Sequence, residues 1–223
     1  MNPTSPSPTT RRDPEFPNLV VTTHPLLRHK VALLRSTSTP KKIFKEAVDE
    51  IAMLMAYEVT ADLETEAYEI ETPLERTTGD RVVGERLTLV PILRAGLGMV
   101  EGVLRLIPTM RVGHIGLQRE HETLEPIDYY FKIPPRPAES DFIVTDPMLA
   151  TGGSASAAIG FLKKSGARRI RLMSIVAAPE GVRRLLEDHP DVTVYAAALD
   201  RQLNENGYIL PGLGDAGDRL FGT

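Results

Sequence analysis

Short runs of apolar residues alternate along this chain with segments in which apolar residues recur at helical spacing. Five runs have the length and composition of buried strands: Leu87–Leu93, Val112–Leu117, Phe142–Thr145, Ile170–Ala177 and Val192–Leu199. Helix-like periodicity separates the strands at about 96–107, 153–165 and 180–188. Apolar strands that alternate with helices are typical of a parallel sheet covered on both faces. We therefore expect an α/β fold with a mostly parallel sheet flanked by helices.

The pattern before these strands predicts two helices and a hairpin. Pro25–Arg35 has the composition of a helix, and Thr39 followed by Pro40 is typical of the cap and first residue of a second, longer one. The predicted apolar face of that second helix consists of Ile43, Ala47, Ile51, Leu54 and Met55. Residues 63–86 are polar and contain Pro and Gly, which predicts a protruding β-arm.

Composition places the chain among globular proteins with one main core. It has 223 residues, of which 42% are hydrophobic and 25% charged, and this suits one domain at residues 19–223. Residues 1–18 are rich in Pro, Ser, Thr and Arg, which predicts a disordered or loosely attached tail. The chain has no cysteine, which excludes disulfides and thiolate metal sites and fits a reducing, cytoplasmic location.

Charge and hydropathy argue against several functional classes. No apolar stretch approaches the roughly 20 residues of a membrane helix, and the N-terminus lacks the apolar region of a secretory signal. The net charge of −4 argues against a general nucleic-acid binder. The five histidines are not spaced as metal ligands, so we expect no metal site made by the protein alone.

The most informative segment runs from the strand Phe142–Thr145 through Asp146 to the next predicted helix. Residues 151–154 (Thr-Gly-Gly-Ser) place unpaired backbone N–H groups and two hydroxyls at a helix N-terminus, where the helix dipole favours an anion. The two glycines also let the backbone approach a phosphate closely. The glycines alone suit an ordinary tight turn equally well. Asp146 favours the phosphate site, because a carboxylate beside it can bind sugar hydroxyls, and the two together suit a ribose 5-phosphate.

The run from Asp146 to Ser154 resembles the ribose-phosphate loop of type I phosphoribosyltransferases. Its residue sequence is similar to that of the uracil phosphoribosyltransferases. Four further segments share the resemblance: Tyr57–Glu66, Val90–Met99, Glu122–Pro126 and Gly207–Gly217. The similarity extends from about Leu19 to the C-terminus. It implies a type I-like fold with a protruding β-arm and a C-terminal base-binding segment.

The resemblance also implies a reaction and its partners. Ribose 5-phosphate would pass from phosphoribosyl pyrophosphate to N1 of uracil, giving UMP and pyrophosphate, as in pyrimidine salvage. The transition state would be oxocarbenium-like and would need no covalent nucleophile. Mg²⁺, carried mainly by the substrate phosphates, would share the pyrophosphate charge. Some relatives are activated by GTP and assemble as dimers or larger oligomers, which suggests GTP as an allosteric activator and a homodimer or larger homo-oligomer here.

Several loops would bind the ribosyl donor. The residues implied by the resemblance are Arg94, Arg119, Asp146, Pro147, Met148, Leu149, Ala150, Thr151, Gly152, Gly153, Ser154 and Asp215. Two of them would be catalytic, Arg119 at the pyrophosphate and Asp146 at the ribose hydroxyls. On local sequence alone, Arg94–Gly96 suits an exposed arginine in a strand-to-helix turn. The resemblance makes it a pyrophosphate loop, of a kind that often holds a non-proline cis peptide in the wider family.

The charged segment Glu120–Pro126, which follows Arg119, has two interpretations. Most charge runs of this kind are solvated hairpins. The resemblance implies a mobile lid that excludes water, because hydrolysis would waste an activated ribose.

The C-terminal segment 207–217 would bind the base. Its composition alone favours a flexible tail, because it contains four glycines. Uracil, however, presents acceptor, donor and acceptor groups along one edge, and a backbone N–H, C=O and N–H can match them without any side chain. The resemblance implies contacts to uracil from Ile209, Gly214, Asp215 and Ala216. A site built on hydrogen bonds can reject cytosine, whose amine would face a donor.

Two other functions compete with this interpretation. One is transfer to another base, against which the segment Gly207–Pro211 argues. The other is a regulatory protein that uses the same fold to bind nucleotide and RNA. The acidic net charge and the intact Arg94 and Arg119 argue against that second function.

Overall fold

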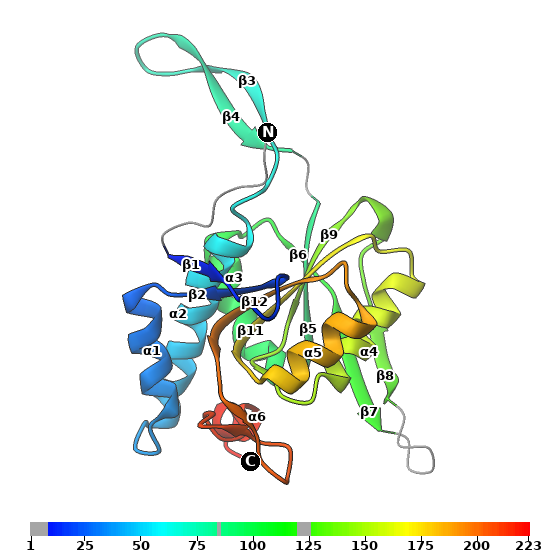
Figure 1. The fold of residues 1–223 in the computed structure, drawn as a ribbon. Coiled ribbons are helices and arrows are strands. Elements are labelled where there is room, and N and C mark those ends of the chain that lie inside the picture. The colour runs from blue at the N-terminus through cyan, green and yellow to red at the C-terminus, as the bar shows by residue number, and fades with distance from the viewer. Residues whose placement is uncertain (1–8, 84–85, 120–125) are drawn as a thin grey trace.

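A mixed sheet forms the centre of the molecule (Figure 1). The computed structural model describes residues 9–83, 86–119 and 126–223, and of residues 119 and 126–128 it describes only the backbone. The strands lie in the order β1 (Thr10–Arg12), β2 (Leu19–Thr22), β12 (Thr193–Leu199), β11 (Arg169–Ala177), β9 (Asp141–Thr145), β5 (Leu87–Leu93), β7 (His114–Arg119) and β8 (Pro126–Lys132). Neighbours from β2 to β7 are parallel, whereas β1 and β8 run antiparallel at the two edges. The expected α/β fold is confirmed.

The predicted apolar strands are confirmed with small shifts. β5 has the predicted bounds, and β9, β11 and β12 each start one residue from the predicted position. The run from Val112 to Leu117 is instead divided into β6 (Arg111–Val112) and β7. The division falls at Gly113, whose N–H bonds to the carbonyl of Leu89, so that both pieces pair with β5.

Helices cover both faces of the sheet (Figure 1). The first face carries α1 (Pro25–Arg35), α2 (Lys41–Val59), the 3₁₀ helix η1 (Ala95–Met99), α3 (Val100–Leu106) and α6 (Ala216–Phe221). The other face carries α4 (Gly153–Lys164) and α5 (Pro179–Asp188), and a short 3₁₀ helix η2 (Pro137–Glu139) precedes β9. Alternation along β5 feeds both cores, because Leu87 and Leu89 pack with the first and Val90 and Ile92 with the second.

The start of α2 differs from the prediction. Phe44 is buried, whereas Ile43, which we expected on the apolar face, is 39% exposed. The predicted Thr39 cap is also wrong. Pro40 occupies the cap position, and the Thr39 hydroxyl donates to the carbonyl of Leu33 at 2.6 Å. That hydroxyl closes the turn between α1 and α2 instead.

Residues 10–18 are not a loose tail. β1 pairs with β2, and the buried Asp13 carboxylate accepts the N–H groups of Glu15 and Phe16. Phe16 is 6% exposed, and the guanidinium of Arg183 lies 5.5 Å from its ring and bonds to Glu15 at 2.8 Å. The prediction of a tail up to residue 18 is therefore wrong for this stretch, while residues 1–8 lie outside the described residues.

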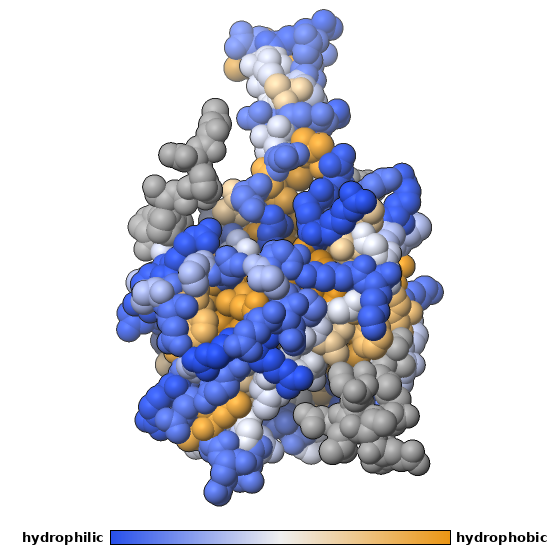
Figure 2. All heavy atoms as spheres, turned by 45° about the vertical axis from the view of Figure 1, so that its right-hand side comes forward, coloured by the Kyte–Doolittle hydropathy of each residue, from blue (hydrophilic) through white to orange (hydrophobic). Residues whose placement is uncertain are grey.

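A two-stranded arm projects from the body, as predicted (Figure 1). β3 (Thr65–Glu71) and β4 (Arg76–Val82) pair antiparallel, and the Thr72 hydroxyl accepts the N–H groups of Leu74 and Glu75 in the turn. Figure 2 shows a hydrophilic outer arm and hydrophobic atoms where the arm meets the body.

Candidate active site

Three loops meet at the carboxyl ends of the parallel strands. Pro91 of β5 pairs with Thr145 of β9, and Leu93 pairs with Gly116 of β7. Arg94, Asp146 and Arg119 therefore leave the sheet at the same edge, where open α/β sheets bind their ligands. Gly96 packs against the end of β9, since a Cβ there would lie 2.4 Å from the carbonyl of Thr145.

The loop Asp146–Ser154 is fixed by main-chain hydrogen bonds to β11. The short strand β10 (Met148–Leu149) pairs with β11, the Pro147 carbonyl accepts from Ile175 and Val176 at 3.1 Å, and the Leu149 carbonyl accepts from Ala178 at 2.9 Å. These bonds use the carbonyl groups of the loop.

The N–H groups of residues 151–155 make no hydrogen bond within the described part of the chain. They lie at the N-terminus of α4, where Gly152 is the cap with φ 78° and the helix starts at Gly153. Thr151 and Ser154 are exposed. A cluster of unpaired N–H groups at the positive end of a helix is suited to an anion. The predicted strand–acid–loop–helix order is confirmed.

Glycine suits positions 152 and 153 of this loop for different reasons. A Cβ on Gly152 would lie 2.6 Å from the carbonyl of Gly181, and its positive φ disfavours other residues. A Cβ on Gly153 would meet only the guanidinium of Arg184, at 3.4 Å. Gly152 is thus required by the fold, whereas Gly153 leaves space beside the helix end. Arg184 makes no ion pair or hydrogen bond within the described residues, so its charge faces this space.

Asp146 lies beside Asp215 of the C-terminal segment. Desolvation raises the pKa of the Asp146 carboxyl to about 7, the hydrogen bond from the Met148 N–H opposes the rise, and the charge of Asp215 adds to it. Asp215 also caps α6, where its carboxylate accepts the Asp218 N–H at 2.9 Å. Two carboxylates close together favour ligands that donate hydrogen bonds or carry positive charge.

The C-terminal segment folds back against two of these loops. Gly207 faces the methyl group of Thr151, and Gly217 faces Ala95. Ile209 and Ala216 are buried, Gly214 is exposed with φ 80°, and β14 (Ile209–Leu210) pairs with β13 (Gln202–Leu203). The flexible-tail interpretation is therefore wrong, because this segment belongs to the first core.

The structure places Arg94 but only the backbone of Arg119. A non-proline cis peptide joins Leu93 to Arg94, as the resemblance implied, and the exposed Arg94 guanidinium lies 5.9 Å from the Phe221 ring. The predicted lid, residues 120–126, lies outside the described residues except for Pro126, whose backbone begins β8. The convergence of the two arginine side chains therefore stays a prediction, although their strands place them at one edge.

Sequence reasoning missed three residues near this edge. Arg184 has no local signal, because it is one of two adjacent arginines on an amphipathic helix. Asp200 follows the apolar strand β12, the same signal that identified Asp146, and it is 7% exposed. Its partner Arg35 is in the last turn of α1, where a basic residue already suits the helix dipole.

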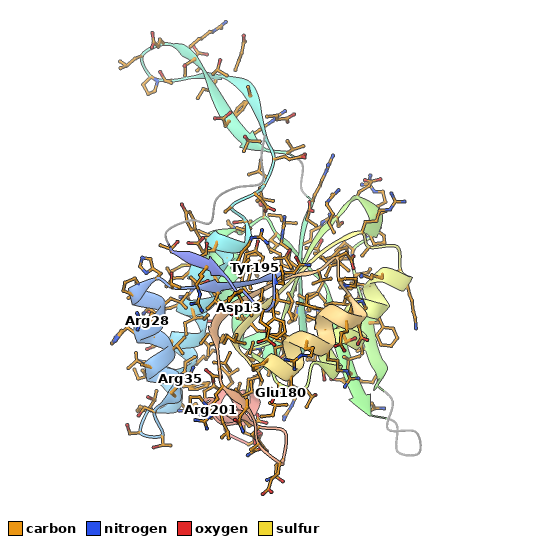
Figure 3. The ribbon with its side chains drawn as sticks, viewed as in Figure 1. Asp13, Arg28, Arg35, Glu180, Tyr195 and Arg201 are labelled. Carbon is orange, nitrogen blue, oxygen red and sulfur yellow. The ribbon has the colours of Figure 1, made fainter. Side chains whose placement is uncertain are left out.

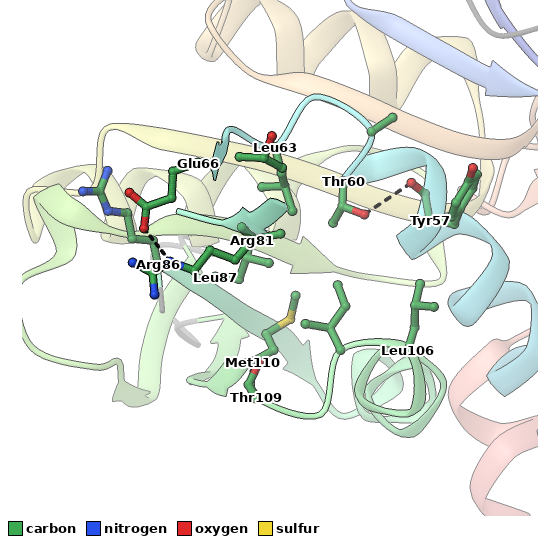
Figure 4. A pocket seen from close by; sticks show the side chains of 14 residues that line it. Tyr57, Thr60, Leu63, Glu66, Arg81, Arg86, Leu87, Leu106, Thr109 and Met110 are labelled. Atoms are coloured by element: carbon green, nitrogen blue, oxygen red, sulfur yellow. Dashed lines mark hydrogen bonds and ion pairs between the residues drawn. The ribbon is translucent and has the colours of Figure 1, made fainter. Parts of the chain in front are cut away.

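A hollow of about 910 Å³ lies at the opposite end of the sheet, at the root of the arm (Figure 4). Its lining includes Tyr57, Leu106 and Met110 with Arg81 and Arg86. It borders Leu87, the first residue of β5, and so it is separate from the loops around Asp146.

Two further findings bear on the chemistry. No cluster of three or more His, Cys, Asp or Glu residues suited to a metal ion occurs among the described residues. No described helix is long and apolar enough to cross a membrane.

Comparison with known proteins decides the family. A family model described as uracil phosphoribosyltransferase matches residues 21–223. This chain belongs to the uracil phosphoribosyltransferase family. Curated members of the family are similar along nearly their whole length. A uracil phosphoribosyltransferase of Exiguobacterium sibiricum is 60% identical over 200 residues, which cover 90% of this chain and 96% of that protein.

Two further members give the same result. A uracil phosphoribosyltransferase of Bacillus thuringiensis is 59% identical over 205 residues, covering 92% of this chain and 98% of that protein. One of Listeria innocua is 59% identical over 206 residues, with 92% and 99% covered. β1 precedes the region that the family model matches.

Solved structures support the same fold. The AQ2163 protein from Aquifex aeolicus is 36% identical with a TM-score of 0.85, covering 91% of this chain and 97% of that one. An adenine phosphoribosyltransferase from Trypanosoma brucei is 10% identical with a TM-score of 0.57, covering 86% and 87%. The second likeness shows the fold alone, which is that of type I phosphoribosyltransferases.

Proposed function

We propose that this chain transfers ribose 5-phosphate from phosphoribosyl pyrophosphate to N1 of uracil, giving UMP and pyrophosphate in pyrimidine salvage. The observation that carries the assignment of roles is the meeting of three features at one edge of the sheet. These are the unpaired N–H groups of residues 151–155, the carboxylates of Asp146 and Asp215, and the folded segment 207–217. These three features suit the phosphate, the ribose and the base of one nucleotide, in that order.

The loop Ala150–Ser154 binds the 5-phosphate in this proposal. Its N–H groups and the hydroxyls of Thr151 and Ser154 donate to the phosphate oxygens, and the dipole of α4 favours the charge. Pro147, Met148 and Leu149 hold the loop through β10. The Arg184 guanidinium, beside Gly153, adds positive charge to the same place.

Asp146 orients the ribose. Its ionised carboxylate accepts hydrogen bonds from the ribose hydroxyls and favours the positive charge that develops on the ring. The raised pKa means that Asp146 is protonated in part at neutral pH without ligand, so donor binding favours loss of that proton. No covalent nucleophile is needed, because the loops hold N1 near C1 of the ribose.

Arg94 and Arg119 bind the leaving pyrophosphate. Both follow neighbouring parallel strands, which supports a common role at one polyanion. The predicted lid after Arg119 would exclude water while the activated ribose is bound.

Mg²⁺ fits this site as an ion carried mainly by substrate. Magnesium is commonly bound by one or two carboxylates together with substrate phosphates, and Asp146 with Asp215 provides such a pair. The ion would supply positive charge that offsets the pyrophosphate. The chain itself provides the two carboxylates and the arginines.

The backbone of residues 209–216 recognises uracil. Ile209, Gly214, Asp215 and Ala216 line the proposed pocket, with main-chain groups that match the acceptor–donor–acceptor edge of the base. Cytosine would place its amine against a donor, which leaves buried polar groups unpaired.

Assembly, regulation and location are further parts of the proposal. We infer a homodimer or larger oligomer, which the apolar hollow at the arm root and the exposed Leu74 at the arm tip support. We also propose GTP as an activator, a cytoplasmic location, and a single domain that includes β1. The lack of cysteine and the acidic net charge support the location and argue against nucleic-acid partners.

A substrate panel tests the proposed function. The full chain is incubated with phosphoribosyl pyrophosphate, Mg²⁺ and one of uracil, cytosine, adenine, guanine or hypoxanthine, and nucleotide is separated by chromatography. We expect UMP alone. Nucleotide from a purine base would assign the chain to another base, and no nucleotide together with tight RNA binding at stated salt would favour the regulatory alternative.

A further inference from the structure

An ion pair holds both backbone groups of Gly212 inside the C-terminal segment. The Arg35 guanidinium bonds in a bidentate manner to Asp200, at 2.8 and 2.5 Å, and donates a further bond to the Gly212 carbonyl at 2.8 Å. The Asp200 carboxylate accepts the Gly212 N–H at 2.9 Å. Figure 3 shows Arg35 at the end of α1 that faces this segment.

The pair is anchored on two rigid elements. The N–H of Asp200 bonds to the carbonyl of Ala177 at the end of β11, and Arg35 lies in the last turn of α1. The Asp200 side chain is 4% exposed and that of Arg35 25% exposed. Buried charges persist where each is paired and hydrogen-bonded, and here the backbone of Gly212 completes the pairing.

A second arginine fixes the next residue. Arg219 of α6 donates to the carbonyls of Leu213 at 2.8 Å and Ser36 at 2.7 Å, and also to that of Leu34. Its guanidinium lies 4.2 Å from the Phe44 ring, and desolvation lowers its pKa. Arg219 thereby holds the end of α1 and the segment 212–213 together.

Gly212 lies between the residues that the proposed function assigns to uracil. It has φ 61°, and a Cβ there would lie 2.1 Å from the carbonyl of Ile209. The turn thus sets the position of Ile209 on one side and of Gly214 on the other. A pocket made of main-chain groups cannot be tuned by its own side chains, so its geometry depends on what holds the backbone.

We propose that Arg35 and Asp200 are positioning residues that set uracil affinity and the choice of uracil over cytosine by fixing the backbone at Gly212. The inference rests on the proposed function, because it assigns the base to segment 209–216. Neither residue touches substrate. Both act through the turn, and the donor loops at Asp146 and Gly152 are held by separate bonds to β11.

The test compares Arg35→Gln with Arg28→Gln, an exposed charge on the same helix (Figure 3). For Arg35→Gln we expect the KM for uracil to rise about tenfold or more, since it loses several charge-assisted hydrogen bonds. The KM for phosphoribosyl pyrophosphate should change less than about twofold by the same reasoning. The ratio of kcat/KM for uracil over cytosine should fall, and Arg28→Gln should match the unchanged chain.

Two further measurements separate positioning from general stability. Arg35→Ala should also have a raised KM for uracil. Guanidinium ion at millimolar concentration should lower that KM part of the way toward the value of the unchanged chain, because the ion can occupy the vacated place beside Asp200. Asp200→Asn should raise the uracil KM in the same way. Combined with Arg35→Gln, it should raise that KM little further than either change alone, because the two residues act as a unit.

The outcomes are distinguishable. If the unchanged chain makes no UMP, the proposed function fails. If it does, and Arg35→Gln leaves the uracil KM and the base ratio unchanged or raises both substrates' KM values equally, the positioning role is overturned. Should Arg35→Gln fail to fold, Arg35→Lys is measured by the same criteria, because lysine keeps the charge but cannot form the bidentate pair.

Discussion

Two backbone-lined parts of the candidate site are held in different ways. The loop Asp146–Ser154 is fixed by main-chain bonds to the neighbouring strand β11. The segment 207–217 pairs with β13 at Ile209 and Leu210, but its turn at Gly212 and Leu213 is fixed by the side chains of Arg35, Asp200 and Arg219. The first arrangement is intrinsic to the sheet, whereas the second depends on tertiary pairing. Phosphate binding should therefore tolerate most side-chain changes, and base recognition should not.

The largest effect should come from Gly212→Ala. Its Cβ would overlap the Ile209 carbonyl at 2.1 Å, and the positive φ adds strain, so we expect a loss of at least about 3 kcal/mol of stability. Uracil transfer should be abolished while phosphoribosyl pyrophosphate still binds below the melting temperature. Calorimetric titration with the donor and a UMP assay measure both, and normal uracil use would contradict the role given to this turn.

Two single changes in the loop Asp146–Ser154 should alter donor binding and leave uracil binding unchanged. Gly152→Ala places a Cβ 2.6 Å from the Gly181 carbonyl at positive φ, and the displaced N–H groups should weaken donor binding roughly 100-fold. Gly153→Ala meets only the flexible end of Arg184 and should keep donor binding within about threefold. The affinity of each variant for phosphoribosyl pyrophosphate is measured. Equal losses of affinity in the two variants would show that the backbone conformation at Gly152 does not determine donor binding.

Asp146→Asn should remove a pH dependence of stability. The folded-state pKa of about 7 exceeds the ordinary value of 3.8, so the contribution of the protonated carboxyl is fully present below about pH 4 and is lost as pH rises to 7. The introduced asparagine carries no charge at any pH. The variant should therefore be more stable than the unchanged chain at pH 8, by on the order of 2 kcal/mol, and equal to it at pH 4. Thermal melting at both pH values measures this.

The same variant should transfer little ribose at any pH. In the unchanged chain, donor affinity should fall below pH 7 as Asp146 gains a proton. If Asp146→Asn is as active as the unchanged chain and no more stable at pH 8, Asp146 does not bind the ribose.

The smallest effect should come from Arg184→Ala. The guanidinium is exposed, so removing its charge should raise the donor KM only about two- to fivefold, with less effect at high salt. The uracil KM should not change. Arg183→Ala, which breaks the contacts to Glu15 and Phe16 instead, serves as the neighbouring control.

The sequence predicted those parts of the site whose signal is local. An acid after a buried strand and two glycines before a helix identified Asp146 and the loop to Ser154, since strand, turn and helix each leave a pattern in consecutive residues. The five apolar strands were found for the same reason. The resemblance added the cis peptide before Arg94 and the role of the C-terminal segment.

The remaining features depend on pairing between distant residues. Arg35 and Asp200 are 165 positions apart, and neither has a local pattern that reveals its partner. Phe16 lies in a proline-rich stretch, yet it packs into the second core and beside Arg183 of α5. Thr39 has the sequence of a helix cap, yet its hydroxyl bonds to a carbonyl in the preceding helix. Local propensity was overridden in each case by a contact that only the folded chain provides.

The strand β1 has a consequence for how copies of this chain avoid one another. Without β1, the apolar strand β2 would present a row of unpaired N–H and C=O groups that a strand of another molecule could pair with. With it, the outermost strand that the structure describes on this side is only three residues long and carries two exposed arginines, Arg11 and Arg12. A short, positively charged edge is a poor template for strand addition. The residues that precede the family match thus shield the sheet, and protect the enzyme against aggregation along that side.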